Sequence, residues 1–375
     1  MCRLSAIISD SYFSPMENIR ALETMKEGHD GSGLGLVLRD LGGEFEDLKA
    51  FPILSGICSE KGLQAMDEYM VHLGFKTKHL WDPKIREQKN LKSRGFYFAR
   101  AYEYPDEIRE AAKEIKFELL LKTRLKLRDM GLEDESITIF SFWPDLITLK
   151  EVGDPFEVGL FFGLEDNPLV AKNIFSQGRQ NTNYAINLYA CHPFFIEGYT
   201  TMTNGENTAF VPIREFLTSR GFSGYVGYRS DSEVFCHILH YMRHQLKLPL
   251  HYYKDVITPL FDREMVDRPD RKAIALMKKC LRPLTIDGPN CVIGTDIDGT
   301  VFMVQDAKKL RPGVVGGVPG KYALMSEVCG VDAVVPERDR SKDVFPMKYD
   351  MAMIAKDAKE IKVWNQKNGS MSTVN

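Results

Sequence analysis

The second residue of the chain carries the side chain with the most direct route to covalent chemistry. The sequence opens "MCRLSAII", so Cys2 directly follows the initiator methionine. Once Met1 is removed, the Cys2 thiol can attack an electrophile while the α-amino group of the same residue takes the thiol proton. An α-amine has a reference pKa of about 7.7–8.0, which suits a base near neutrality. The alternative interpretation is an inert, buried thiol at the start of the short apolar strand "RLSAIIS".

A nucleophile that attacks a carbonyl needs donors aimed at the developing oxyanion. The stretch "TNGEN" offers two of them, the side-chain amide of Asn204 and the backbone N–H of Gly205. The alternative interpretation is a type I′ turn, for which Asn-Gly is a strong signal. The two interpretations are compatible, because a tight turn is one way to expose a backbone N–H.

A free amino acid substrate needs one cation and one anion for its two charged ends. Arg179 in "GRQNTN" could hold a carboxylate as a bidentate fork, and Asp231 in "YRSDSE" could hold an ammonium group. Taken singly, each residue is better explained as a surface charge or, for Asp231, as a helix cap.

Composition excludes several classes of protein. The 375 residues carry a formal net charge of -3, and no Lys/Arg block with interleaved aromatics suggests nucleic acid. No apolar run approaches the ~18 residues that span a bilayer, so we expect no membrane segment. The seven cysteines are scattered without a CxxC pair, which argues against a disulfide framework or an iron–sulfur centre and favours a cytoplasmic location.

The pattern of elements predicts an α+β fold, because many short strands mix with a few helices without regular βαβ alternation. Residues 81–151 differ from the rest of the chain in their residue pattern and are interpreted as an inserted block of helix and strands. Residues 366–375 are interpreted as a frayed tail.

In "CHILHYMRH" the residues His237, His240 and His244 share one helix face. We interpret this face as solvated or partly packed and expect no metal site, because no neighbouring carboxylate completes one.

Taken together, these motifs resemble a known family. The chain is similar to the class II glutamine amidotransferases, the N-terminal-nucleophile type, and most of all to the amidotransferase domain of glutamate synthase. The resemblance rests on elements in family order, outside the block 81–151: the opening Cys2, "RQNTNY", "HPF", "TNGEN", "SDSE" and "LTIDGPNCVIGTDIDGTVFMVQDAKKLRP".

The resemblance implies a four-layer αββα sandwich over residues 2–365 and a role for each motif. Cys2 would be the nucleophile, and Asn204 and Gly205 the oxyanion hole. Arg179 with Thr182 would hold the glutamine α-carboxylate, Asp231 would hold the α-ammonium group, and Gly28 would belong to the substrate-binding turn.

The implied activity is release of ammonia from glutamine for a synthase subunit on another polypeptide. No cofactor is expected on this chain, and FMN and an Fe–S cluster are expected only on that partner. Two departures from the family pattern leave alternatives open. Lys26-Glu27-Gly28 stands where the family has His-Arg-Gly, and Thr203 replaces the His before Asn-Gly. The alternatives are a regulatory or scaffold subunit with weak or no turnover, and an N-terminal-nucleophile hydrolase of another amide.

Overall fold

The chain forms three antiparallel sheets within residues 2–166, 169–181, 186–221 and 230–374, which are the residues described by the computed structural model. The first sheet has the strand order β13 (Val314–Val318), β14 (Lys321–Met325), β1 (Arg3–Phe13), β8 (Ala171–Gly178), β2 (Leu34–Leu41) and β7 (Leu146–Glu151). The second has the order β17 (Ser370–Val374), β16 (Ile361–Asn365), β15 (Asp350–Ile354), β12 (Val301–Gln305), β11 (Asn290–Thr295), β10 (Tyr199–Gly205) and β9 (Phe194–Ile196).

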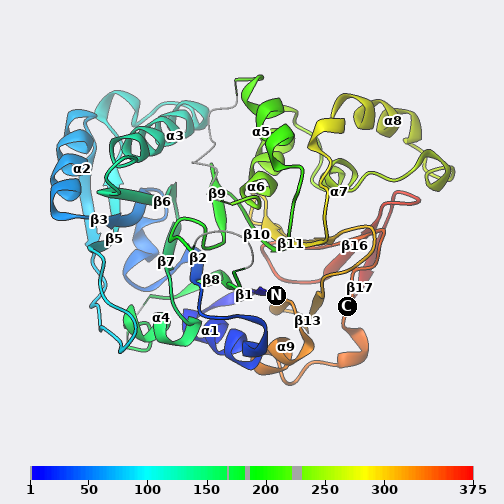
Figure 1. Ribbon diagram of the computed structural model, residues 1–375, viewed down its shortest axis with the longest axis horizontal. Helices are drawn as coiled ribbons and strands as arrows, with labels where there is room; N and C mark the ends of the chain where they lie inside the picture. The colour runs from blue at the N-terminus through cyan, green and yellow to red at the C-terminus, as the bar shows by residue number, and fades with distance from the viewer. Residues whose placement is uncertain (1, 167–168, 182–185, 222–229, 375) are drawn as a thin grey trace.

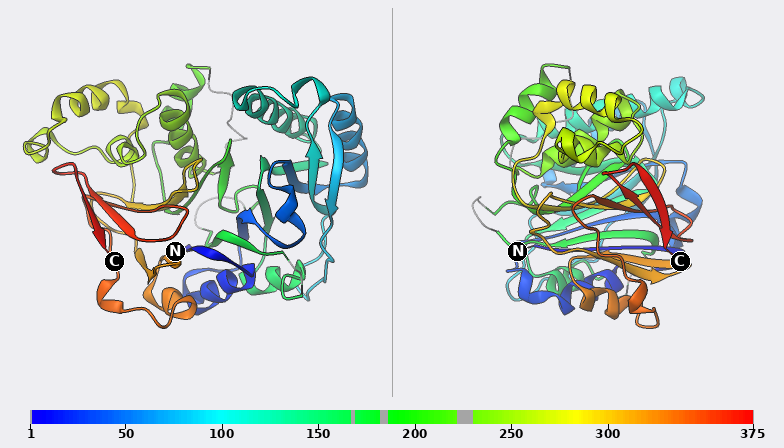
Figure 2. Two further views of the ribbon diagram at one scale, coloured as in Figure 1. Left: turned by 180° about the vertical axis from the view of Figure 1, so that it is seen from behind. Right: turned by 90° about the vertical axis from the view of Figure 1, so that its right-hand side faces the viewer.

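These two sheets pack face to face between two layers of helices (Figures 1 and 2). Ile7 of β1 faces the helices of one outer layer, while its neighbours Ala6 and Ile8 face the second sheet. This alternation is what a central strand buried on both faces requires. The outer layer on the first sheet consists of α1 (Pro15–Thr24), α4 (Pro155–Phe161) and α9 (Val328–Val334), and that on the second of α5 (Phe210–Thr218), α6 (Glu233–His240) and α7 (Tyr252–Ile257).

Helix α1 begins where the sequence predicts it. Ser14 is the N-cap, its side chain accepting from the backbone N–H of Met16, and Pro15 occupies the first helical position. The α+β class predicted from the sequence is confirmed, with antiparallel sheets throughout the described strand pairs.

The third sheet belongs to an insertion whose boundaries differ from the predicted 81–151. Its strands follow the order β4, β5, β3, β6, and together with α2 and α3 they form a β-α-β-β-α-β unit of split βαβ topology, spanning 52–144. The last predicted strand of the block, β7, instead pairs with β2 in the first sheet. The members of the unit are β3 (Pro52–Cys58), α2 (Glu60–His72), β4 (Lys76–Trp81), β5 (Phe96–Glu103), α3 (Lys113–Met130) and β6 (Ile137–Pro144).

The C-terminal residues also differ from expectation. In place of a frayed tail over 366–375, strand β17 pairs antiparallel with β16, in the register Asn365↔Ser370. The turn "KNG" explains this, because Gly369 adopts φ 73° and donates its N–H to Asn365 O at 2.8 Å. Among the described residues, no helix combines the length and apolar character that crossing a bilayer requires.

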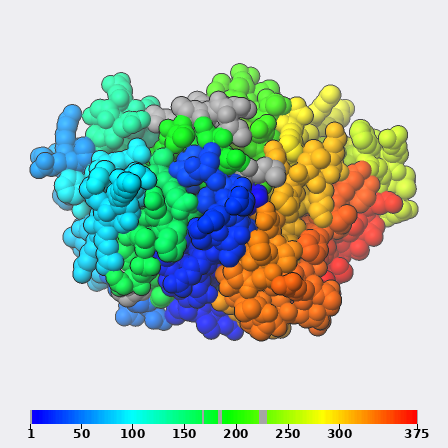
Figure 3. All heavy atoms as spheres, turned by 60° about the horizontal axis from the view of Figure 1, so that its bottom comes forward, coloured from blue at the N-terminus to red at the C-terminus, as the bar shows by residue number. Residues whose placement is uncertain are grey.

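The surface view shows the N-terminal segment lying against the segments near residue 315 and beyond (Figure 3). This contact follows from the sheet order, because β1 pairs with β14 in the register Ala6↔Leu324. Residue 2 is therefore anchored by a central strand with neighbours on both sides.

Candidate active site

The Cys2 thiol lies at the entrance to β1, beside the chain that leaves β8. The register Arg3↔Gly178 continues to place residue 2 opposite residue 179, with Gln180 next to it. Gln180 donates its backbone N–H to Cys2 Sγ at 3.3 Å, and the Gln180 carbonyl lies 3.5 Å from the same sulfur. The thiol is partly buried and is held in place by a central strand.

Burial raises the pKa of the Cys2 thiol above its usual value. The Gln180 N–H and the charge of Arg179 act in the opposite direction and do not cancel the effect of burial. The sulfur is therefore a protonated thiol at neutral pH. Nucleophilic attack requires a base next to the thiol, which is the function predicted for the α-amine of the same residue.

Four of the seven predicted site residues line one small cavity of about 40 Å³. These four are Cys2, Arg179, Gly205 and Asp231. Asn204 and Gly28 are not among the lining residues, and Thr182 falls outside the described part of the chain. The remaining lining residues are Gln180, Asn181, His192, Thr203, Glu206, Ser230 and Ser232.

The guanidinium of Arg179 is buried at the end of β8. The backbone N–H of Arg179 donates to Gly33 O at 2.9 Å, and its side-chain Nη2 donates to Asn181 Oδ1 at 3.2 Å. Nη1 is buried and has no hydrogen-bond partner within the part of the chain that the structure describes. A buried donor without an acceptor is costly, so an anion such as a carboxylate in the cavity would be stabilised here.

Asp231 connects the start of α6 to the loop that follows β10. Its Oδ2 accepts from the backbone N–H of Asn207 at 2.7 Å, and its Oδ1 accepts from the Ser232 hydroxyl at 3.2 Å. Burial raises the pKa of the Asp231 carboxyl, and the Asn207 N–H opposes this shift. A carboxylate has about four acceptor positions, so Asp231 retains the capacity to accept from an ammonium group in the cavity.

The Asn204-Gly205 pair ends strand β10 and does not form the tight turn considered as the alternative. Asn204 pairs with Cys291 of β11, and the backbone N–H of Glu206 donates to Pro289 O at 3.1 Å. Because hydrogen-bonded pairs alternate along an antiparallel ladder, the N–H of Gly205 points away from β11. The N–H of Thr203, two residues earlier on the same edge, donates to His192 Nδ1 at 3.1 Å.

The side chain of Asn204 is buried, and its Nδ2 atom has no hydrogen-bond partner among the described residues. In a strand, alternate side chains leave opposite faces, which explains why Thr203 and Gly205 line the cavity and Asn204 between them does not. The backbone donor of the predicted oxyanion pair is thus at the cavity, while the side-chain donor would have to reorient to reach it.

His192 is a cavity residue to which the sequence analysis assigned no function. Its Nδ1 accepts from the Thr203 N–H and contacts Gln177 Nε2 at 3.0 Å. Because a backbone N–H is always a donor, Nδ1 carries the lone pair and the proton of the neutral ring is on Nε2. Burial lowers the pKa of His192 well below its usual value, so the ring is neutral at pH 7. The signal in the sequence was the "HPF" element, one of the motifs on which the resemblance rests.

Gly28 has a structural explanation that does not involve substrate. A Cβ on Gly28 would lie 2.0 Å from Arg3 Cζ, so the absence of a side chain makes room for the Arg3 guanidinium. Arg3 pairs with Glu327 at 2.5 Å. Glu27, which stands where the family has arginine, is exposed.

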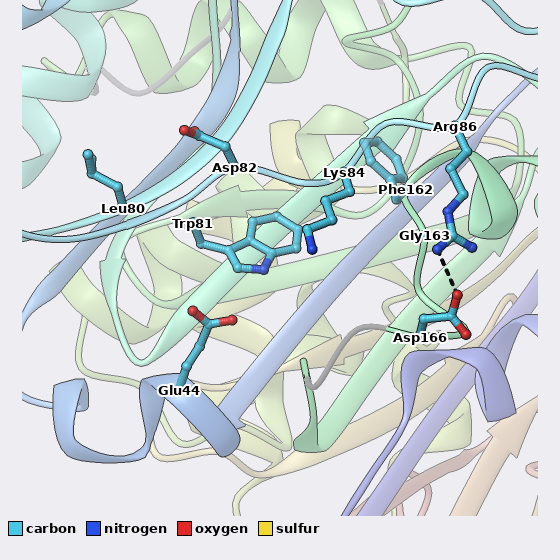
Figure 4. A pocket seen from close by; sticks show the side chains of 9 residues that line it. All are labelled: Glu44, Leu80, Trp81, Asp82, Lys84, Arg86, Phe162, Gly163 and Asp166. Atoms are coloured by element: carbon cyan, nitrogen blue, oxygen red, sulfur yellow. Dashed lines mark hydrogen bonds and ion pairs between the residues drawn. The ribbon is translucent and has the colours of Figure 1, made fainter.

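A larger cavity of about 360 Å³ lies at the edge of the insertion and shares no lining residue with the Cys2 cavity (Figure 4). Its wall contains Trp81 and Lys84, with Arg86 paired to Asp166 at 2.7 Å. None of its lining residues is a cysteine, serine, threonine or histidine. The predicted nucleophile and charged groups therefore converge on the smaller cavity.

No family model matches the chain, and no curated protein sequence matches it. Among solved structures, the glutamine phosphoribosylpyrophosphate amidotransferase from B. subtilis aligns at 13% identity with a TM-score of 0.48, covering 97% of this chain and 49% of that chain. A structure described as the allosteric regulatory enzyme of purine biosynthesis aligns at 13% identity with a TM-score of 0.50, also covering 97% of this chain and 49% of that chain. The chain spans about half the length of these proteins. At this identity the likeness to the second of these structures concerns the fold alone.

Proposed function

We propose that the protein is a glutamine amidotransferase component in which Cys2, freed by removal of Met1, attacks the side-chain amide of glutamine. The observation that carries this proposal is the convergence of a thiol, a buried guanidinium and a buried carboxylate on one cavity. A free amino acid presents one carboxylate and one ammonium group, and Arg179 and Asp231 are complementary to these two charges. Neither charged residue would be needed by an esterase or a peptidase acting within a chain.

The proposed reaction proceeds in two stages. The thiol proton moves to the Cys2 α-amine, the sulfur bonds to the amide carbon of glutamine, and the carbonyl oxygen becomes an oxyanion near the Gly205 N–H. The carbon–nitrogen bond then breaks as the α-ammonium group returns its proton to the leaving nitrogen, which departs as ammonia. Water hydrolyses the remaining γ-glutamyl thioester to glutamate and restores the thiol.

The size of the cavity imposes a condition on this function. The cavity volume of about 40 Å³ compares with the ~10–15 Å³ that holds one water molecule in the same measure. This enclosed space is smaller than glutamine, so a bound glutamine would extend beyond it or the lining residues would move apart. This observation also favours a second candidate, a scaffold or regulatory subunit that keeps the fold and has lost turnover.

The released ammonia needs an acceptor, and we place it on a separate synthase subunit in the cytoplasm, of the kind found in glutamate synthases. That partner would carry the FMN and Fe–S cluster, because the scattered cysteines of this chain offer no cluster-binding motif. Hydrolysis of an amide other than glutamine is the remaining alternative.

One experiment separates these candidates. The N-terminus of the purified protein is determined by intact mass, and the protein is then treated with an electrophilic glutamine analogue. The Cys2→Ala variant tests the nucleophile, and Cys280→Ala is the matched control because Cys280 is an exposed thiol outside the cavity. Ammonia release from glutamine is measured in parallel.

We expect loss of Met1, labelling at residue 2, and loss of both labelling and ammonia release in Cys2→Ala alone. Active protein that retains Met1 contradicts the mechanism. A free Cys2 that is not labelled, in protein that releases no ammonia, supports the scaffold. Labelling without ammonia release from glutamine, but with turnover of another amide, supports the other hydrolase.

A further inference from the structure

Two histidines and a glutamate meet at the C-terminal end of α6. His240 is the last residue of α6, His244 belongs to the π-helical turn Tyr241–Gln245 that continues it, and Glu197 lies in the turn between β9 and β10. One ligand atom from each of the three residues lies within 4.8 Å of the other two. The sequence predicted no metal site because the helix lacks a suitable carboxylate, and the tertiary structure supplies one from 43 residues earlier.

The three side chains are arranged for coordination. Glu197 and His240 are only 6% and 3% exposed, and Nε2 of His240 is hydrogen-bonded to Oε2 of Glu197. The imidazole rings of His240 and His244 stack with centroids 4.8 Å apart and an interplanar angle of 9°. His244 is only partly buried, which leaves one side of the cluster open to solvent and to an entering ion.

The backbone at Glu197 provides a second, independent observation. Ile196 pairs with Tyr199, so Glu197 and Gly198 form a two-residue hairpin loop, with φ values of 43° and 82°. A type I′ turn favours Asn, Asp or Gly at its first position, and a longer side chain there costs about 1–2 kcal/mol. A strained glutamate whose carboxylate is also buried points to a function for that carboxylate.

We propose that Glu197, His240 and His244 bind a divalent transition-metal ion of the zinc class. Two imidazoles and one carboxylate form a donor set that suits zinc and disfavours magnesium or calcium, which prefer oxygen ligands. Bringing the ligand atoms from 4.8 Å to the separation required by bonds of about 2.0–2.2 Å needs only small side-chain rotations. A solvent molecule would occupy the open fourth position.

The position of the site indicates a structural role. The ion would join the β9–β10 turn to the end of α6, two elements that also contact each other directly (Figure 1). At the ends far from the proposed ion, strand β10 finishes at Gly205 and helix α6 begins at Glu233, two residues after Asp231. Strand β10 rises about 3.3 Å per residue, so the ion would lie roughly 20 Å from Gly205 and would stabilise the fold without contacting Cys2.

The competing explanation is a packed polar cluster in which His240 and Glu197 share a hydrogen bond and bind nothing. The test uses full-length protein without a histidine tag, made metal-free by chelation and titrated with Zn²⁺, Co²⁺ or Mg²⁺. The variants are His244→Ala, whose ring is partly exposed, and the near-isosteric Glu197→Gln. The control is His72→Ala, at an exposed histidine that ends α2.

We expect one Zn²⁺ per chain by elemental analysis, a Tm that rises with Zn²⁺, and visible absorption bands on addition of Co²⁺. Both cluster variants should bind Zn²⁺ at least about 100-fold more weakly, since removing a ligand costs more than removing an outer-shell partner, while His72→Ala should match the wild type. Circular dichroism of the metal-free variants verifies that they fold. Equal Zn²⁺ affinity in wild type and His244→Ala, no binding at all, or equal affinity for Mg²⁺ would overturn the proposal.

Discussion

Replacing Asp231 with asparagine tests whether this buried carboxylate holds the ammonium group of a substrate. Asparagine keeps the size of the side chain and an oxygen that can accept the Asn207 N–H, which now donates to Oδ2 at 2.7 Å. What is lost is the negative charge that faces the cavity. A hydrogen bond to a charged group contributes about 1.5–3 kcal/mol. At about 1.4 kcal/mol per factor of ten, kcat/KM should fall about 10–150-fold.

The stability of the same variant should move in the opposite direction. Burial raises the pKa of Asp231, so the folded state binds its proton more tightly than the unfolded state does. Ionisation of this group therefore lowers the free energy of unfolding as the pH rises from the usual carboxyl range through the raised value. Asp231→Asn removes that contribution, and its Tm at pH 7 should be equal to or higher than that of the wild type.

The assay measures ammonia release against glutamine concentration between pH 5 and pH 8, with Tm recorded for each protein. The matched control is Glu206→Gln, which also removes one negative charge from the cavity wall. We expect the KM for glutamine to rise in Asp231→Asn and to change little in Glu206→Gln. In the wild type, kcat/KM should fall as the pH is lowered. Because the pKa of Asp231 is raised, this fall should begin at a pH above the usual carboxyl pKa. An unchanged KM in Asp231→Asn, or an equal rise in the control, would refute the assignment.

Two further predictions concern residues around the site. Gly28→Ala should displace the Arg3 guanidinium and break its pair with Glu327, lowering the free energy of unfolding by about 1–2 kcal/mol. In an Arg3→Met background, the same change should leave the free energy of unfolding unchanged. Urea denaturation of the wild type, the two single variants and the double variant measures the difference. Lys150 is buried, donates from Nζ to Tyr189 O at 3.2 Å, and has its pKa lowered to about 7 by burial. Because the unfolded chain keeps this proton up to about pH 10.4, the free energy of unfolding should rise by at most about 1.4 kcal/mol per pH unit above pH 7. Lys150→Met should lose this rise; a pH profile identical to that of the wild type would show that Lys150 does not titrate in the folded protein.

The two outer boundaries of the insertion show where sequence patterns lose information. Strands β3 and β7 are both buried along their whole length, on both faces. Such strands carry no alternation that assigns them to one sheet, so the pairing of β3 with β5 and of β7 with β2 depends on contacts distant in sequence. The predicted block 81–151 began at the last residue of β4 and ended at the last residue of β7. At the C-terminus, by contrast, the sequence contains the local turn signal "KNG". This signal favours a hairpin, whereas the polar composition of the segment led to the prediction of a frayed tail.

Within the candidate site, residue types were predictable and orientations were not. Cys2, Arg179, Gly205 and Asp231 line one cavity, and the functions that the resemblance implies for them stay predictions. The same motifs placed Asn204 at the cavity, yet strand alternation turns its side chain to the other face. The position of His192 at the cavity follows from its place just before β9, where its ring accepts the N–H of Thr203 from β10.

The sequence by itself determined the local chemistry: a cysteine at residue 2, the helix caps, the α+β class and the charged motifs in order. These depend on side-chain type and on periodicity over a few residues. Only the tertiary structure decided which groups share a site, because antiparallel pairing joins Cys2 to Gln180, and a hairpin turn brings Glu197 to His240. Such pairings are set by the burial of whole sheets, and no single stretch of sequence contains them.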